Sequence, residues 1–379
     1  MAVLFGVVAA MTRLLTCLLL VLLPAHFGLA SPAAEWLPAP MPAASLDNNQ
    51  RVQRVALGSC FNPARSDEIF AVINNTQADV LLLLGDNVYA EKETADIELP
   101  SLKAAYAALA ASPAFADLRR DMPLLVTWDD HDYGVNDGGG DWPAKNASQA
   151  LFKHVWDIGP DDPRTSRQGV YFSRIVGPVG QRLQIIMLDT RFFRTPLQKS
   201  AARLPGGRYI PSADPQQNML GEAQWQWLEA QLRQPAEVRI IATSIQMIAD
   251  GHNWEAWLTM PLERRRFYQL LQDTAAQGVV LVSGDRHLGA LYEQTSDVPY
   301  PLLELTASSL NLPLSALVKN PTAEPGPFRL GAPYFDANFG LVDIDWDKRM
   351  LTLRLMNDLG AEVRSKSVQF DALVPAGQD

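Results

Sequence analysis

Apolar side chains along this chain recur with two different periods, and together they predict strands separated by helices. Continuous apolar runs of strand length are typical of strands buried on both faces of a sheet, and they occur at 80–84, 123–127, 238–243 and 279–282. Apolar positions at helical spacing occur at 66–74, 101–120 with an interruption at Pro113, 221–233 and 262–277. This alternation predicts an α/β fold with parallel strands.

Other segments look like antiparallel strands. Residues 171–176 and 182–188 are spaced as a hairpin, and the chain ends with shorter alternating segments at 301–308, 340–346, 350–357 and 363–370. We expect this C-terminal group to extend a second sheet. A first strand is predicted at 51–60, with the helix at 66–74 as the crossover to the strand at 80–84.

The composition is that of a globular protein. Of 379 residues, 47% are hydrophobic and 20% charged, enough to bury one sizeable core, and we expect a single domain over 51–372 after a Pro- and Ala-rich linker at 31–50. The net charge of −10 argues against attraction to nucleic acid or to an anionic membrane. A phosphate-bearing substrate would therefore need local positive charge, most simply from metal ions. We expect a monomer.

The first thirty residues predict a cleavable signal peptide. Arg13 precedes a Leu-rich run at 14–23, which is too short to span a bilayer comfortably, and small residues follow at 28–30. We expect export to a periplasmic, extracellular or secretory compartment, with a retained N-terminal anchor as the alternative. Cys17 lies in this segment, so the mature chain keeps only Cys60, which is then buried, a metal ligand or a nucleophile.

Polar side chains follow the predicted strands at the point where each strand ends, which is where ligands collect in α/β sheets. The candidates are Cys60, Asp86, Tyr89, Asp129, Asp130, His131, Asp132, Arg191, Gln246, Asp285 and His287. An Asp-Asn turn at Asp86 and an acidic surface loop around His131 are the plain alternatives. Arg191 is either a bidentate clamp for an oxyanion or the partner of Asp189 or another acid.

The candidate ligands fall into two chemical kinds. Thiolate, phenolate and imidazole suit a trivalent or borderline transition metal, whereas carboxylate and amide oxygens suit a harder ion such as Ca²⁺ or Mn²⁺. Two dissimilar metals are therefore expected, with Asp86 as the bridge between them. Two such ions would activate a water molecule and hold phosphate oxygens.

Five motifs resemble the alkaline phosphatase D (PhoD-like) family of metallophosphatases, which is similar in fold to the calcineurin-like and purple acid phosphatases. The motifs are Gly58-Ser59-Cys60, Gly85-Asp86-Asn87-x-Tyr89, Trp128-Asp-Asp-His131-Asp, Leu188-Asp-Thr-Arg191 and Ser283-Gly-Asp285-Arg-His287, and the resemblance spans 52–305. It implies a four-layer α/β/β/α sandwich of two mixed sheets flanked by helices.

The resemblance also implies roles for individual residues. Fe³⁺ would be held by Cys60, Asp86, Tyr89 and His287. Ca²⁺ would be held by Asp86, Asp130 and Asp285, with Gln246 or Asn136. His131 would contact the phosphate and protonate the leaving oxygen.

We therefore expect an exported binuclear metal-dependent phosphoric ester hydrolase, a phosphomonoesterase or phosphodiesterase, in which metal-bound hydroxide attacks phosphorus. One alternative is a non-catalytic exported metal-binding or adhesion protein on the same scaffold. The other is a hydrolase with Cys60 as nucleophile and His131 or His287 as base. The second alternative explains the single cysteine but leaves Tyr89 and the repeated carboxylates without a role.

Overall fold

The structure is a computed structural model that describes residues 36–90, 97–322 and 324–375. The predicted signal peptide lies outside the described residues, as does the start of the predicted linker. One compact unit, Leu37–Asp379, contains every helix and strand described below.

The first sheet has six strands in the order β12-β11-β10-β1-β2-β3. Its parallel half is β1 (Arg54–Gly58), β2 (Val80–Leu83) and β3 (Leu124–Val126), and its antiparallel half is β10 (Asn338–Asp345), β11 (Met350–Asn357) and β12 (Glu362–Gln369). The expectation that the last three strands extend a second sheet was wrong. β10 pairs with β1 because the backbone groups on that edge of the buried β1 require hydrogen-bond partners.

The second sheet also has six strands, in the order β4-β5-β6-β7-β9-β8. They are β4 (Phe172–Val176), β5 (Leu183–Met187), β6 (Val238–Thr243), β7 (Val279–Ser283), β8 (Gly289–Gln294) and β9 (Leu302–Ala307). The predicted β4–β5 hairpin is present. β9 pairs parallel with β7 and antiparallel with β8, a strand that the sequence pattern did not predict.

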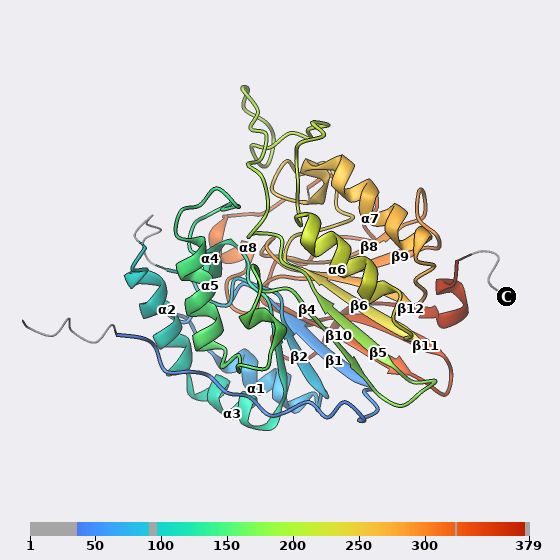
Figure 1. Cartoon of the computed structure of the whole chain (residues 1–379), viewed down its shortest axis with the longest axis horizontal. Helices are drawn as coiled ribbons and strands as arrows, with labels where there is room; N and C mark the ends of the chain where they lie inside the picture. The colour runs from blue at the N-terminus through green and yellow to red at the C-terminus, as the bar shows by residue number, and fades with distance from the viewer. Residues whose placement is uncertain (1–35, 91–96, 323, 376–379) are drawn as a thin grey trace, which may run out of the picture. The chain divides into compact units, whose positions relative to one another are not determined.

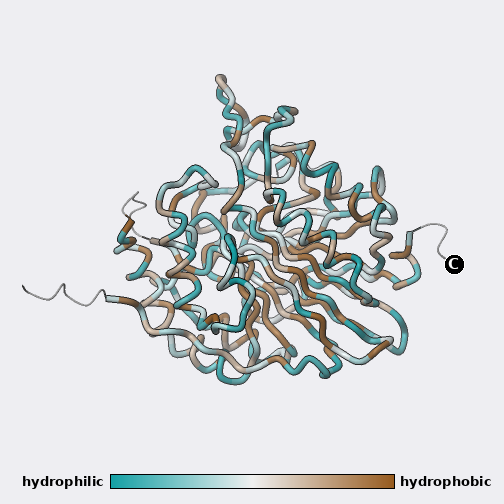
Figure 2. The backbone as a smooth tube through the Cα atoms, viewed as in Figure 1, coloured by the Kyte–Doolittle hydropathy of each residue, from teal (hydrophilic) through white to brown (hydrophobic). Residues whose placement is uncertain are grey.

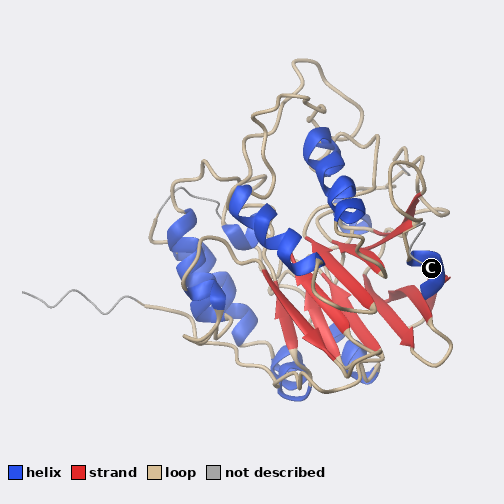
Figure 3. Ribbon diagram, turned by 45° about the vertical axis from the view of Figure 1, so that its right-hand side comes forward, coloured by secondary structure: helices blue, strands red, loops and turns tan. Residues whose placement is uncertain are grey.

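Helices cover the outer face of each sheet, which gives the expected four-layer α/β/β/α sandwich (Figures 1 and 3). The first sheet is covered by α1 (Glu68–Asn75), α2 (Pro100–Ala110), α3 (Pro113–Asp121) and α5 (Lys145–Val155), and the second by α6 (Glu222–Leu232) and α7 (Pro261–Asp273). Short helices are α4 (Asp130–Tyr133) and α8 (Leu314–Leu317), with 3₁₀ turns at Pro163–Thr165, Trp257–Thr259 and Phe370–Leu373. Within the described ranges, no helix combines the length and hydropathy needed to cross a membrane.

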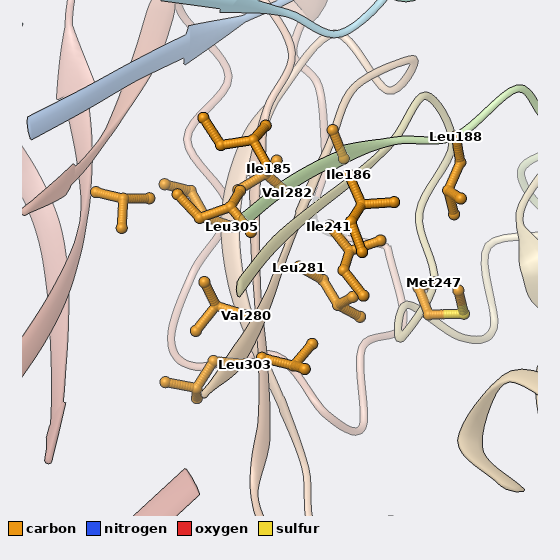
Figure 4. Close-up of a cluster of buried hydrophobic side chains, with 14 of the residues drawn as sticks. Ile185, Ile186, Leu188, Ile241, Met247, Val280, Leu281, Val282, Leu303 and Leu305 are labelled. Carbon is orange, nitrogen blue, oxygen red and sulfur yellow. The ribbon is translucent and has the colours of Figure 1, made fainter. Parts of the chain in front are cut away.

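The core follows from the two-residue period of the strands. In β2, Val80 and Leu82 pack between the two sheets, whereas Leu81 and Leu83 pack under the helices of the first sheet. Hydrophobic positions concentrate in the strands of both sheets (Figure 2). Figure 4 shows the part of the core that β5, β6, β7 and β9 supply, including Ile185 and Val280. Both sheets are thereby held in place, and so are the loops that leave their strands.

Candidate metal centre

Side chains from four strand ends converge on one place. Cys60 follows β1, Asp86 follows β2, His131 lies in the short helix after β3, and His287 follows β7. Among the described residues, three groups of potential ligands each have their donor atoms within 4.8 Å of one another: Cys60, Asp86 and His287 form the first, Asp86, Asp130 and His131 the second, and Asp130, Asp137 and Glu255 the third. Asp86 belongs to the first two groups, and Asp130 belongs to the second and third.

The first group is built around the carboxylate of Asp86. The hydroxyl of Tyr89 donates a 2.7 Å hydrogen bond to Asp86 Oδ2, and Sγ of Cys60 lies 3.5 Å from the same oxygen. The ring of His287 is oriented by a 2.6 Å contact between its Nδ1 and the carbonyl oxygen of Leu312. A carbonyl oxygen only accepts, so Nδ1 carries the hydrogen and Nε2 keeps its lone pair for a metal.

Ser308 links the thiol and the imidazole of this group. Its Oγ accepts a 2.9 Å hydrogen bond from the backbone N–H of His287 and lies 3.2 Å from Sγ of Cys60. Burial acts to raise the pKa of Cys60, but the charge and hydrogen bond of His287, together with the hydrogen bonds of Ser308 and Tyr89, outweigh it and lower that pKa to about 6. A thiolate, the form that binds metals, therefore predominates at neutral pH.

The carboxylates of the second group lie buried beside one another and near Asp285. Burial acts to raise the pKa of Asp130, but the charges of His131 and Arg191 and the hydrogen bond from Asp137 lower it to about 2. Burial, together with the charges of Asp130 and Cys60, raises the pKa of Asp86 well above its usual range, and burial with the charge of Asp129 does the same for Asp285. Asp130 Oδ2 accepts a 2.7 Å hydrogen bond from the backbone of Asp137, but its buried Oδ1 has no hydrogen-bond partner. Such buried acids are stabilised by a cation among them.

Four of the candidate ligands have left-handed backbone conformations. The φ angles are 58° at Cys60, 51° at Asp86, 70° at Asp285 and 53° at His287. Residues other than glycine rarely adopt this region, and each instance costs on the order of 1–3 kcal/mol. Strain of this kind persists where it serves a site, and here it turns the chain at the strand ends that carry the ligands.

Arg191 is not placed as an oxyanion clamp. Its guanidinium is fully buried and binds two acids, with Nε 2.6 Å from Asp129 Oδ1 and an Nη 2.6 Å from Glu255 Oε2. The structure therefore favours the ion-pair alternative, although the partners are Asp129 and Glu255. Asp189 instead accepts from the backbone N–H of Arg191 and from the indole of Trp128.

Gln246 does not line the cavity that Asp86 and Asp130 line, and its amide nitrogen is held by two hydroxyls. Its Nε2 donates to the hydroxyls of Tyr292, at 3.1 Å, and Thr306, at 3.0 Å. Asn136, the other residue considered for this position, lines the same cavity as Asp86 and Asp130. The geometry favours Asn136 over Gln246 as the amide near the second group.

A cavity of about 980 Å³ opens onto the centre, and Asp86, Asp130, His131, Asp285 and His287 line one end of it. Residues 202–208 form part of its wall. They belong to the long loop between β5 and α6, which extends beyond the strand ends in Figures 1 and 3.

Some residues of the centre carried no assignment from sequence. Arg286 lines the cavity between the candidate ligands Asp285 and His287, and it forms a 2.6 Å ion pair with Glu324. Its position inside the Gly-Asp-Arg-His motif was the available signal. Ser308 had no such signal, because it contacts Cys60 across 248 positions of sequence.

One solved structure shares this fold, and a second gives a weaker match. A structure described as "Structure of PhoD" superimposes with a TM-score of 0.67 at 16% identity, covering 90% of this chain and 74% of that chain. "GAP50 the anchor in the inner membrane complex of Plasmodium" has a TM-score of 0.48 at 12% identity, covering 85% of this chain and 90% of that one. A comparison with curated protein sequences found no match.

Family membership follows from the sequence itself. The model of the family described as PhoD-like phosphatase matches residues 55–323, which include every candidate ligand named above. The same family was expected from the motifs at the strand ends. This chain therefore belongs to the PhoD-like phosphatase family.

Proposed function

We propose that this protein is an exported phosphoric ester hydrolase that uses two metal ions. Membership of a phosphatase family supports hydrolysis of phosphate esters. The observation that carries the binuclear assignment is the position of Asp86, whose carboxylate is common to two of the three groups of potential ligands. A shared carboxylate is the usual bridge between two cations that act together on a phosphate.

The donor atoms fit two different ions. Cys60, Asp86, Tyr89 and His287 would hold the softer or more highly charged ion, Fe³⁺ by family resemblance, and Asp86, Asp130, Asp285 and Asn136 would hold the harder one, Ca²⁺ by the same resemblance. The unpartnered Oδ1 of Asp130 and the raised pKa of Asp86 and of Asp285 support this fit. When bound, the pair of ions supplies an activated water and neutralises charge on the phosphate oxygens.

The protein's own groups would handle the proton and the negative charge of the ester. His131 lines the cavity, its ring packs 4.2 Å from the ring of Tyr89, and its backbone N–H donates to Asp86 Oδ1. As a water oxygen bonds to phosphorus and the ester P–O bond breaks, the His131 imidazolium would give its proton to the leaving oxygen. Arg286, which lines the cavity whereas Arg191 does not, would be the arginine that faces a phosphate.

Arg191 would act as a positioning residue. It binds Asp129, the N-cap residue of the helix that carries Asp130 and His131. Asp129 also accepts a 2.6 Å hydrogen bond from Ser244, so the start of this helix is tied to the end of β6. The ion pair thereby supports the orientation of two candidate site residues without contacting the substrate.

The position of Cys60 favours a ligand over a nucleophile. Its side chain is fully buried, and it is not among the residues that line the cavity. A nucleophile must reach the phosphorus atom of a bound ester, and access of that kind is absent at Cys60. Alkylation of the metal-loaded enzyme should therefore leave its activity intact.

Metal removal and reconstitution test the proposal. We expect chelation to abolish hydrolysis of aryl phosphate monoesters and diesters, and re-addition of metals to restore it in step with two bound ions per chain by elemental analysis. Full activity of a metal-free sample would refute the binuclear mechanism. Tight metal binding without hydrolysis of any ester would instead favour the non-catalytic binding protein.

Export rests on the first thirty residues alone, and it has its own test. Expression in a secreting host should give a mature protein that starts near Ser31, as measured by intact mass and N-terminal sequencing. An intracellular product that retains residue 1 would contradict export.

A further inference from the structure

The cavity that opens onto the metal centre has an apolar wall at its outer part. Among the described residues, large apolar side chains that remain exposed are uncommon, and three of them line this cavity: Trp254 is 42% exposed, Leu317 50% and Val318 46%. Leu204 and Pro205 continue the same lining. Clustered exposed apolar side chains beside a site mark a surface that an apolar ligand covers.

The backbone fixes this wall relative to the candidate ligands. Leu317 ends α8, a helix with no buried side chain, and Val318 follows it. The first residue of that helix, Leu314, donates a 2.7 Å backbone hydrogen bond to the carbonyl oxygen of His287. The helix that presents Leu317 is therefore tied directly to a candidate metal ligand.

Trp254 lies in the segment that follows β6, whose carboxyl end is at the same edge of the sheet as that of β7. Its backbone N–H donates to Nδ1 of His252, and the guanidinium of Arg286 lies 5.4 Å from the centre of its ring. Arg286 thus touches both parts of the cavity, since it lies next to His287 in the chain and packs on the indole. A phosphate at the centre and an organic group on Trp254 would be adjacent.

The size of the cavity favours an ester with a large organic group. Its volume of about 980 Å³ is near the upper end of the roughly 300–1,000 Å³ common for small-molecule sites, far beyond the needs of a phosphate group. The apolar side chains named above border part of the space that remains, and Arg203, Arg208 and Glu324 border other parts. Removing apolar surface from water there would strengthen substrate binding.

We propose that the apolar wall formed by Trp254, Leu317 and Val318 selects phosphoric esters whose organic group is an alkyl or aryl group. This inference rests on the proposed function, because the ester would be cleaved at the adjacent centre. It names the substrate class that the sequence motifs leave open.

A chain-length series tests the inference. In methyl, butyl and octyl p-nitrophenyl phosphates the leaving group is constant, so only the apolar substituent changes. With metal-loaded full-length enzyme, below the micelle concentration of each ester, we expect kcat/KM to rise roughly two- to fourfold per methylene over the first few carbons. The increase in kcat/KM should come from a lower KM, with kcat unchanged, because substrate and transition state bind the wall equally. Phenyl p-nitrophenyl phosphate tests an aryl group in the same way. If kcat/KM exceeds that of the methyl ester only for the alkyl esters, or only for the phenyl ester, the result identifies which organic group the wall selects.

Variants distinguish the wall from a general effect of chain length. Trp254→Ala and the pair Leu317→Ser with Val318→Ser should reduce the octyl-to-methyl ratio of kcat/KM at least about fivefold. Val179→Ser is the control, because Val179 is 84% exposed and lies outside the cavity, and its ratio should equal that of the unmodified protein. A flat series, or an unchanged ratio in the wall variants, overturns the inference.

Failure of the proposed function is separable from failure of the inference. If no ester of the series is hydrolysed, calorimetry with alkyl phosphonates of the same chain lengths reports on the wall alone. Affinity that rises with chain length and falls in Trp254→Ala would retain the apolar subsite, whereas equal affinities would overturn it.

Discussion

The phenol of Tyr89 donates a 2.7 Å hydrogen bond to Oδ2 of Asp86, three residues earlier in the chain. The left-handed backbone of Asp86, with φ of 51°, turns the chain directly after β2, so that both side chains enter the same site. This contact joins a phenol to the carboxylate that two groups of potential ligands share, one containing Cys60 and His287 and the other Asp130 and His131.

Replacement of Tyr89 tests the identity of the first metal. If Tyr89 ligates Fe³⁺, the metal-loaded protein shows a visible phenolate-to-iron charge-transfer band, and Tyr89→Phe loses it together with at least about tenfold in iron affinity. Absorption spectroscopy and elemental analysis measure both. Tyr106→Phe is the matched control, since Tyr106 is a buried phenol that contacts Asp132 rather than Asp86. An unchanged band in Tyr89→Phe would exclude this ligand.

The lowered pKa of Cys60 predicts how the metal-free protein titrates. Thiolate absorbance in the ultraviolet should appear with a midpoint near pH 6, because His287, Ser308 and Tyr89 together stabilise the thiolate more than burial destabilises it. The thiol is protonated below that pH and ionised above it. In His287→Asn only the hydrogen bonds of Ser308 and Tyr89 oppose the effect of burial, so the midpoint should move upward. Cys60→Ser is the control that measures any absorbance from Cys17. A midpoint for Cys60 near the ordinary thiol pKa of about 8.5 would contradict the interaction of Cys60 with His287.

The role of His131 as a proton donor predicts a dependence on the leaving group. His131→Gln should reduce kcat about 10²- to 10⁴-fold for alkyl esters, whose leaving oxygen needs a proton, and much less for p-nitrophenyl esters. Steady-state kinetics over a series of leaving groups measures the effect. His154→Gln should have no effect, because the ring of His154 binds the carbonyl oxygen of Pro38. An equal loss on every ester would point to a binding role.

The buried ion pairs of Arg191 predict a large effect on stability. Arg191→Ala leaves the buried carboxylate of Asp129 without its cationic partner and leaves Glu255 with Arg194 alone, so we expect the free energy of unfolding to fall by about 3–5 kcal/mol. Arg233→Ala breaks an exposed pair with Glu229 and should change it by less than about 1 kcal/mol. Urea denaturation compares the two. A stable Arg191→Ala protein that had lost only kcat would restore the oxyanion-clamp interpretation.

Close packing at Gly207 predicts that the loop at 202–208 depends on this glycine. A Cβ added there would lie 2.0 Å from the carbonyl oxygen of Asn253, and the N–H of Gly207 donates to the carbonyl oxygen of His252. Gly207→Ala should detach the loop, speed its proteolysis and raise KM, while the global free energy of unfolding changes by less than about 1 kcal/mol. Gly159→Ala has open space around its Cβ and is the control. Unaltered proteolysis in Gly207→Ala would argue against this anchor.

The sequence alone predicted most of the strands, most of the helices that cover them and the polar side chains at the strand ends. Runs such as 80–84 are apolar because both faces of the strand are buried. Such a run consists of consecutive residues, so it can be recognised from the sequence without knowledge of the fold. Asp86 could be assigned to a site because the carboxyl ends of parallel strands share one edge. The family followed from the order of these motifs.

The tertiary structure decided the placements that depend on distant partners. The alternating pattern of a strand such as β10 indicates that one of its faces is buried. The pattern does not indicate which strand it pairs with, and in the structure that strand is β1. The sequence also shows that Arg191 is charged, but its partners Asp129 and Glu255 lie 62 and 64 positions away in the chain. Only the folded structure shows that Arg191 is buried against these two acids and does not face the substrate. Trp254 and Leu317 face one cavity for the same reason: local periodicity sets which side of an element is apolar, and long-range packing sets what that side meets.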